Sequence, residues 1–315
     1  MIGGSGFVGS NLINLCNKLN ILNFDKSNSD LHQDITFIGN ILDSYALDNV
    51  MNGINYVVLL AAEHKDNVSP KSLYYDVNVK GTQNVLDSMD RNGVKNLIFT
   101  SSVAVYGLNK QSPNEDSSKD PFNDYGKSKL MAENRIIDWY NINKMNKSIT
   151  IIRPTVIFGK KNRGNVFNLL KQIFSKRFIM IGDGNNKKSM AYVENVALFI
   201  KNRLEANKMG CEIYNYVDKP DLTMNELVNE IELISDLKIP KFKLYYVLAL
   251  IIGYVFDFLS LIFNRPLNIS SVRIKKFCST TQFSSKKINH IFHPKYSLTE
   301  ALKITILNEF MSNQE

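Results

Sequence analysis

Three side chains far apart in the sequence could together move a proton. Tyr125 and Lys129 form the pattern Y-x-x-x-K, and this spacing puts both residues on one face of a helix. A lysine ammonium beside a phenol favours the phenolate, so we expect Lys129 to lower the pKa of Tyr125 from its ordinary value of about 10. Ser102 follows an apolar run of strand length and could share the hydrogen bond. These residue types predict acid–base chemistry on a substrate hydroxyl.

A glycine-rich loop at the start of the chain predicts a site for a dinucleotide. Gly3, Gly6 and Gly9 form G-x-x-G-x-x-G, and a helix predicted at 8–18 follows. Such a loop lets the backbone approach a pyrophosphate, and the helix N-terminus favours its negative charge. Asp25 closes the next short apolar run, where a carboxylate binds both hydroxyls of an adenosine ribose and repels a 2′-phosphate. The cofactor predicted from these residues is therefore NAD.

A dinucleotide-binding fold places a buried parallel strand before this loop. Only Met1 and Ile2 precede Gly3. We therefore expect a truncated first strand, with a loss of stability, in a chain whose start is assigned too late or that is a fragment.

Apolar runs of strand length alternate with helical patterns through residue 157. The runs lie at 21–24, 35–38, 56–60, 96–100 and 148–152, and the longest helical patterns lie at 71–92 and 125–143. Alternation of this kind predicts an α/β fold with a doubly wound parallel (Rossmann) sheet. We expect residues 1–157 to form the NAD-binding domain. Residues 158–315 are expected to form mainly a smaller α/β substrate-binding domain, interleaved with the first.

The composition is that of a globular protein suited to anionic partners. Of 315 residues, 44% are hydrophobic and 22% are charged, which excludes a disordered chain, a collagen-like fibre and a coiled coil. The 3 cysteines form no C-x-x-C pair, so we expect no disulfide scaffold, zinc ribbon or other metal site. The net charge of +8 suits nucleic acid, lipid headgroups or diphosphates.

The segment 244–263 is strongly apolar. It carries one charge, Asp257, and basic residues flank it. Three interpretations stay open: a buried helix pair, an interfacial helix whose basic flanks contact anionic headgroups, or a true membrane span. A span needs about 20 apolar residues. Because Asp257 is costly in hydrocarbon, we favour the interfacial, membrane-associating helix.

Taken in order, these motifs resemble those of the extended short-chain dehydrogenase/reductases, in the nucleotide-sugar epimerase/dehydratase branch. Tyr125-Gly-Lys-Ser-Lys129 matches the family's catalytic tyrosine and lysine, and Thr-Ser-Ser-Val-Ala-Val-Tyr-Gly at 100–107 places Ser102 at its catalytic serine. The resemblance implies NAD as cofactor and a homodimer formed through helices at 71–92 and 125–143. It implies cofactor contacts from Gly3, Gly6, Phe7, Val8, Gly9, Asp25, Asn40, Ile41, Leu60, Ala61, Ala62, Asn78, Tyr125, Lys129 and Pro154.

Longer stretches are similar to the bacterial O-antigen epimerases that act on an amino sugar linked to undecaprenyl diphosphate. These stretches lie at 57–81, 101–110, 153–173, 214–222 and 273–283. The resemblance implies an isomerase that inverts C4 of the sugar through a 4-keto intermediate, with Tyr125 as acid and base, and that regenerates its NAD. It also implies a peripheral enzyme of lipopolysaccharide synthesis on the cytoplasmic face of the inner membrane, with no nucleic-acid partner.

Substrate contacts are expected at Ser102, Arg163, Asn165 and Lys188. Lys188 stands where the family carries an arginine on the substrate diphosphate, and a lysine offers a point charge in place of a planar fork. This departure leaves two other enzymes open, namely a soluble UDP-N-acetylglucosamine (or UDP-glucose) 4-epimerase and a nucleotide-sugar 4-keto reductase. A non-enzymatic NAD-sensing or RNA-binding protein is the third alternative, and the intact catalytic set argues against it.

Overall fold

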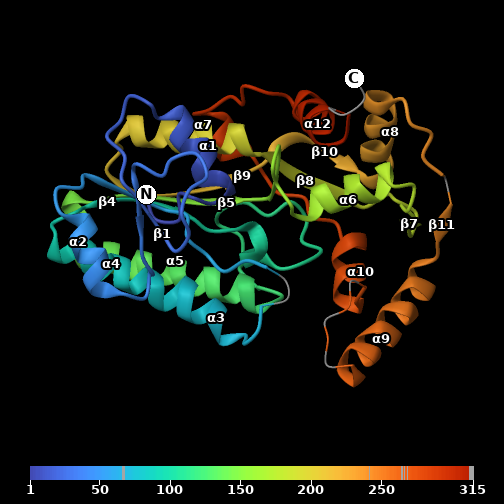
Figure 1. The fold of residues 1–315 in the computed structure, drawn as a ribbon, viewed down its shortest axis with the longest axis horizontal. Coiled ribbons are helices and arrows are strands. Elements are labelled where there is room, and N and C mark those ends of the chain that lie inside the picture. The colour runs from blue at the N-terminus through green and yellow to red at the C-terminus, as the bar shows by residue number, and fades with distance from the viewer. Residues whose placement is uncertain (66–67, 241, 264, 266, 268, 312–315) are drawn as a thin grey trace.

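The first half of the chain, together with a strand at 210–216, forms a parallel sheet in a computed structural model, which describes residues 1–65, 68–240, 242–263, 265, 267 and 269–311 (Figure 1). The strands are β1 (Asn23–Asp25), β2 (Thr36–Ile38), β3 (Tyr56–Leu59), β4 (Asn96–Thr100), β5 (Ser148–Pro154) and β9 (Gly210–Tyr216). Every pairing among them is parallel, and the order is β2-β1 followed by β3-β4-β5-β9. The prediction of a doubly wound α/β sheet is confirmed.

The central position between β1 and β3 is filled by the first residues of the chain. Ile2 bridges Phe24 on one side and Leu59 on the other, both in parallel register. Its N–H donates to Val58 O at 2.9 Å, and its carbonyl accepts from Leu60 N at 2.8 Å. The expected first strand is thus very short, yet its place in the sheet is occupied.

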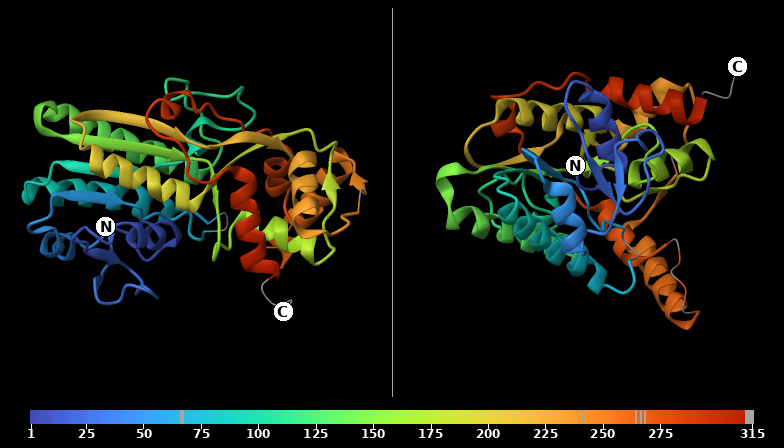
Figure 2. Two further views of the ribbon diagram at one scale, coloured as in Figure 1. Left: turned by 90° about the horizontal axis from the view of Figure 1, so that it is seen from above. Right: turned by 60° about the vertical axis from the view of Figure 1, so that its left-hand side comes forward.

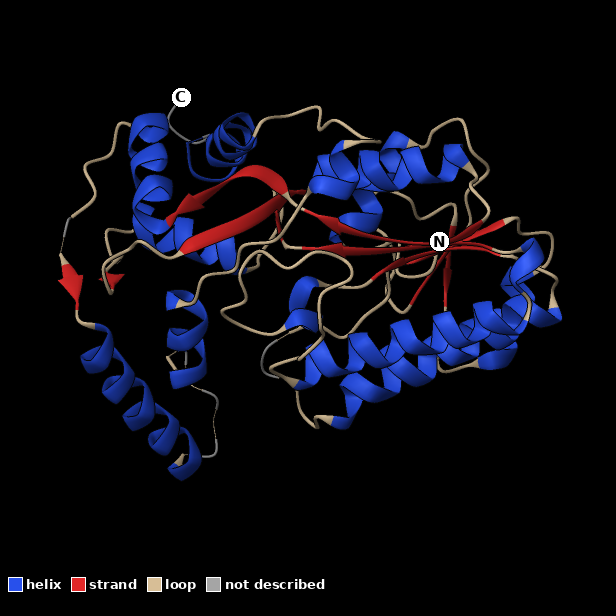
Figure 3. Cartoon of the chain, turned by 180° about the vertical axis from the view of Figure 1, so that it is seen from behind, coloured by secondary structure: helices blue, strands red, loops and turns tan. Residues whose placement is uncertain are grey.

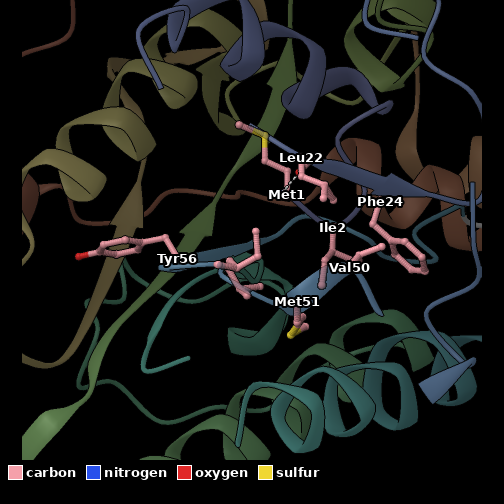
Figure 4. A pocket seen from close by; sticks show the side chains of 9 residues that line it. Met1, Ile2, Leu22, Phe24, Val50, Met51 and Tyr56 are labelled. Carbon is pink, nitrogen blue, oxygen red and sulfur yellow. Dashed lines mark hydrogen bonds between the residues drawn. The ribbon is translucent and has the colours of Figure 1, made fainter. Parts of the chain in front are cut away.

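Met1 lies inside the sheet layer, and its nitrogen donates to the carbonyl of Leu22. A small apolar pocket adjoins it (Figure 4), lined by Met1, Ile2, Leu22, Phe24, Val50, Met51, Ile54, Tyr56 and Val57. The pocket therefore lies next to the position that Ile2 occupies between β1 and β3.

Helices cover both faces of this sheet. On one face lie α1 (Phe7–Leu15) and α7 (Val193–Ala206); on the other lie α2 (Ser44–Met51), α4 (Gly81–Arg91) and α5 (Asp124–Ile142) (Figure 1). The single helix expected at 71–92 is divided into α3 (Ser72–Tyr75), a π-helical turn (Asp76–Lys80) and α4. Single π-helical turns are frequent at functional sites.

The second half is built around a three-stranded sheet in the order β10-β8-β6. Its strands are β6 (Val156–Phe158), β8 (Lys187–Tyr192) and β10 (Asp218–Thr223), with β7 (Met180–Ile181) and β11 (Lys243–Leu244) as a separate parallel pair. The helices are α6 (Asn165–Phe174), α8 (Met224–Ser235), α11 (Lys286–Asn289) and α12 (Leu298–Ile306). Because β9 returns to pair with β5 in the first sheet, the two halves are physically interleaved (Figure 2).

The apolar segment forms one helix, α9 (Tyr246–Ile262), which is followed by α10 (Ser271–Cys278). The two helices pack together and extend away from both sheets (Figure 3). Most large side chains of α9 are exposed, so the interpretation as a buried helix pair is wrong. Among the described residues, no helix is both long enough and apolar enough to cross a bilayer.

Candidate active site

The glycine loop brings three backbone segments into close contact. Gly3 has a φ of +85°, and a Cβ there would lie 2.4 Å from the backbone nitrogen of Ala61. A Cβ on Gly9 would lie 2.4 Å from the Cα of Gly4. Gly6 precedes α1 and has no side chain to cap the helix, so the first-turn N–H groups stay available for an anion. This cradle fits the diphosphate of a dinucleotide.

The carboxylate of Asp25 closes one side of the glycine loop. Its two oxygens accept from the backbone N–H groups of Ser5 and Ser27, each at 3.0 Å. A carboxylate has about four acceptor sites, so acceptors remain for two ribose hydroxyls. The placement at the carboxyl end of β1 fits the predicted role in binding an adenosine ribose.

The remaining predicted cofactor contacts lie along the carboxyl edge of the sheet or next to it. Asn40 is exposed, Pro154 is buried at the end of β5, and Ile41 is buried in the core under Gly81. The others are half-buried: Phe7, Val8, Leu60, Ala61 and Ala62.

Asn78 differs from these residues because its side chain bonds within the protein. It accepts from Glu63 N at 2.8 Å and donates to Glu63 O and Ser128 Oγ, each at 2.9 Å. Ser128 in turn donates to the carbonyl of Tyr125 at 2.8 Å. Asn78, on the π-helical turn, thus ties the loop after β3 to the first turn of α5.

Ser102 and Tyr125 are brought together by a close approach between two segments. Ser102 caps a short 3-10 helix (Val103–Tyr106) after β4, where its Oγ accepts from Ala104 N at 3.1 Å. Tyr125 is the second residue of α5, and the next residue is Gly126, where a Cβ would lie 2.6 Å from Ala104 O. The missing side chain at Gly126 lets α5 start against this turn, and Ser102 lies close enough to the Tyr125 phenol to favour its phenolate.

The pKa of Tyr125 departs from the prediction. Burial raises it above its ordinary value, and the hydrogen bond from Ser102 lowers it by less. Burial also lowers the pKa of Lys129 to about 7, against a smaller raising effect of Glu133. The prediction that Lys129 lowers the pKa of Tyr125 is therefore wrong for the protein alone, because desolvation acts on both groups and dominates each of them.

Lys129 lies in the interior beside an aromatic ring. Its side chain is 1% exposed, and its Nζ lies 4.1 Å from the centroid of the Phe99 ring. Such a contact favours a cation and offsets part of the cost of burying one. Lys129 is therefore fixed in position on α5.

A buried polar network that the sequence analysis missed lies one turn further along α5. Arg153 donates from Nε and Nη2 to the two oxygens of Glu133, at 2.9 and 2.6 Å, and from Nη1 to Tyr106 Oη at 2.6 Å. Tyr106 donates to Asn215 Oδ1 at 2.8 Å. One signal was available in the sequence: Glu133 repeats the four-residue spacing that separates Lys129 from Tyr125.

The three further candidates for substrate contact have different surroundings in the structure. Arg163 pairs with Glu309 at 2.7 Å, and Asn165 is exposed at the first turn of α6. Lys188 Nζ donates to the carbonyls of Lys276 and Ser279, at 2.9 and 2.6 Å, and burial lowers its pKa to about 8. Two of its three donors are thus committed to the end of α10, and its role on a diphosphate stays a prediction.

The sequence is similar to those of known NAD-dependent enzymes. A family model described as the NAD dependent epimerase/dehydratase family matches residues 1–216. The chain is 55% identical to the N-acetyl-alpha-D-glucosaminyl-diphospho-ditrans,octacis-undecaprenol 4-epimerase of Escherichia coli O157:H7, over 99% of this chain and 95% of that protein. It is 26% identical to the UDP-glucose 4-epimerase of Vibrio cholerae, over 75% of each chain.

Several solved structures have the same fold as this chain. MoeE5 in complex with UDP-glucuronic acid and NAD superposes with a TM-score of 0.78 at 20% identity, covering 99% of this chain and 98% of that one. The UDP-N-acetylglucosamine 4-epimerase from Bacillus cereus gives a TM-score of 0.72 at 18% identity, covering 98% of each chain. The chain therefore belongs to the NAD-dependent epimerase/dehydratase family, and its cofactor is NAD.

Proposed function

We propose that this protein is a 4-epimerase that interconverts N-acetylglucosaminyl- and N-acetylgalactosaminyl-diphospho-undecaprenol. The observation that carries the proposal is the 55% identity to the Escherichia coli enzyme of that name along almost the whole chain. The pairing of Ser102 with Tyr125 at the carboxyl edge of the sheet adds the chemistry that an epimerase needs.

The residues of the chain supply positioning and proton transfer. The Tyr125 phenol donates a proton to the 4-keto oxygen when the product alcohol forms, and as phenolate it accepts the proton of the sugar 4-hydroxyl. Ser102 hydrogen-bonds the phenol and orients the same substrate oxygen. When bound, NAD would supply the acceptor for the C4 hydride and, in its reduced form, the donor of that hydride to the other face of the sugar. The glycine loop, Asp25 and Lys129 would hold the cofactor.

We infer that the positive charge of Lys129 favours the phenolate form of Tyr125. Because burial keeps Tyr125 neutral in the protein alone, the phenolate has to be favoured by added positive charge. The ammonium of Lys129 provides it, and bound NAD in its oxidised form would add to it. With a pKa of about 7, Lys129 responds to a neighbouring charge within the physiological pH range.

The substrate class is tested with two sugars that differ only in what the diphosphate carries. Purified protein with bound NAD is incubated with N-acetylglucosaminyl-diphospho-undecaprenol and, in parallel, with UDP-N-acetylglucosamine. We expect turnover of the lipid-linked sugar at substoichiometric NAD. Turnover of the UDP-sugar alone would overturn the proposal, and consumption of one NADH per product would identify a 4-keto reductase instead.

We also propose where the enzyme works and in which form. A lipid-linked substrate supports a location on the cytoplasmic face of the bacterial inner membrane, in the synthesis of O-antigen. A homodimer through α4 and α5 is supported by their adjacent position on the outer face of the first sheet (Figure 1). Light scattering of the purified protein tests the dimer, and Arg163, Asn165 and Lys188 remain our candidates for the substrate diphosphate.

A further inference from the structure

One face of α9 is a continuous row of exposed apolar side chains. We call it the apolar stripe, and its members are each 48–80% exposed: Val247, Leu248, Ile251, Tyr254, Val255, Phe258, Leu261 and Ile262. They recur every three or four residues, so they share one side of the helix. Contiguous apolar surface of this kind marks an interaction site.

The opposite face of α9 is locked against α10. Ala249 and Gly253 are buried there, and a Cβ on Gly253 would lie 2.9 Å from the backbone nitrogen of Ser271. The carboxylate of Asp257 accepts from Ser271 N at 3.2 Å. The one charge of the apolar segment is thus turned into the helix pair and away from the stripe, so it adds no cost when the stripe meets an apolar medium.

Basic groups stand at the rim of the stripe. The Nζ of Lys275, on α10, lies 5.4 Å from the ring centroid of Tyr254. Lys243 precedes α9 and Arg265 follows it, and both are exposed. Tyrosine and lysine side chains at the border of an apolar surface are typical of a membrane interface, where anionic headgroups meet the acyl region.

The helix pair is fixed to the substrate-binding half at its base. Lys188 on β8 donates to the carbonyls of Lys276 and Ser279, which end α10, and β11 pairs with β7 just before α9. A surface that contacts α9 therefore also sets the orientation of β8 and the helices around it.

We propose that the apolar stripe is the membrane-docking surface of this enzyme and that it lies in one leaflet of an anionic bilayer. The inference rests on the proposed function in one respect, namely that a lipid-linked sugar gives the enzyme a reason to sit on a bilayer. A second copy of the chain fits the stripe less well. A symmetric contact would bring the two basic rims together, and like charges oppose such pairing.

Vesicle flotation of the purified full-length protein tests the surface. The vesicles contain phosphatidylethanolamine, phosphatidylglycerol and cardiolipin, or phosphatidylcholine alone. We compare Phe258→Glu/Leu261→Glu in the stripe with Met209→Glu/Leu233→Glu, a control pair that is 52% and 81% exposed outside α9 and outside α4 and α5. We expect the protein and the control to float with anionic vesicles, and the stripe variant to partition at least tenfold less.

Three results would overturn the inference. They are a wild-type protein that does not float, a stripe variant that floats like the wild type, and a stripe variant that loses only its dimer in light scattering. Equal melting temperatures of the two variants show that both are folded. Flotation needs no substrate, so it decides the docking surface even if the enzyme turns over UDP-sugar alone.

A second readout connects the surface with turnover. Lipid-linked sugar is supplied in detergent micelles and in anionic vesicles. We expect the stripe variant to keep wild-type turnover in micelles and to lose at least tenfold in vesicles. Equal turnover in the two media would contradict the docking role, whereas failure of the wild type in both would count against the proposed substrate.

Discussion

Arg153 and Glu133 form a two-point ion pair in the interior, with Nη2 2.6 Å from Oε2 and both side chains 1% exposed. Glu133 lies one turn beyond Lys129 on α5, and Arg153 lies on β5. The pair therefore joins the catalytic helix to the sheet beneath it. It also supplies the negative charge that partly offsets the desolvation of the Lys129 ammonium.

Removing the charge of Glu133 should destabilise the protein. In Glu133→Gln the guanidinium of Arg153 stays buried without a counter-charge, and we expect the free energy of unfolding to fall by about 3 kcal/mol. Urea denaturation measures the change. The control is Glu205→Gln, whose exposed pair with Lys201 spans 3.9 Å and should change stability by less than about 0.5 kcal/mol. Equal effects of the two variants would show that the buried pair has no special role.

Replacing the phenol of Tyr125 should stop catalysis and leave the fold intact. We expect Tyr125→Phe to lower kcat by about 10²–10⁴-fold, the usual contribution of a positioned acid–base group. Tyr140→Phe on the same helix is the control and should keep kcat. The affinity for NAD, measured by titration calorimetry, should be similar in both variants. A kcat for Tyr125→Phe within twofold of the wild type would refute its role as acid and base.

The stability of the cofactor-free protein should depend on pH through Lys129. Burial lowers its pKa from 10.5 to about 7, so between these values the unfolded chain binds a proton that the folded protein lacks. Stability then rises with pH in this window, and the cost of burying the charge is largest below pH 7. Lys129→Met removes that cost. We expect its gain over the wild type to shrink by about 3 kcal/mol from pH 6 to pH 9.

Urea denaturation at pH 6 and pH 9 measures this change. Lys171→Met is the control, because Lys171 is exposed on α6. Its difference from the wild type should stay constant across the pH range. If the Lys129→Met difference were also constant, the ammonium would not be desolvated in the folded protein.

Cofactor choice should depend on the charge of Asp25. Asp25→Asn keeps an oxygen for a backbone N–H of the loop and removes the charge that repels a 2′-phosphate. We expect the ratio of NAD to NADP affinity to fall at least tenfold in titration calorimetry. Glu63→Gln, which changes a nearby carboxylate paired with Lys26, should leave the ratio unchanged. An unchanged ratio for Asp25→Asn would place the ribose elsewhere.

Local patterns in the sequence were enough to predict the layers of the fold and the helix that carries Tyr125 and Lys129. Strand-length apolar runs coincide with β3, β4 and β5, and the four-residue spacing of Tyr125 and Lys129 lies on a helix that runs from Asp124 to Ile142. Such features depend on neighbours along the chain, so periodicity reports them.

Features set by distant parts of the chain could not be predicted in this way. Lys188 bonds to carbonyls 88 and 91 residues away, and Asp257 turns toward Ser271 on the next helix. Ile2 fills the central position of the sheet because two other strands offer it hydrogen bonds. The pKa of Tyr125 depends on burial among tertiary neighbours, which a motif does not specify.

The return of β9 to the first sheet has a consequence for how the molecule is made. During synthesis, residues 148–154 leave the ribosome well before residues 210–216, which pair with them along their full length. Until then one border of the nascent sheet offers free N–H and C=O groups to any extended peptide nearby. Chaperone binding to newly made chains should therefore centre on β5, and the two halves should finish folding as one cooperative unit.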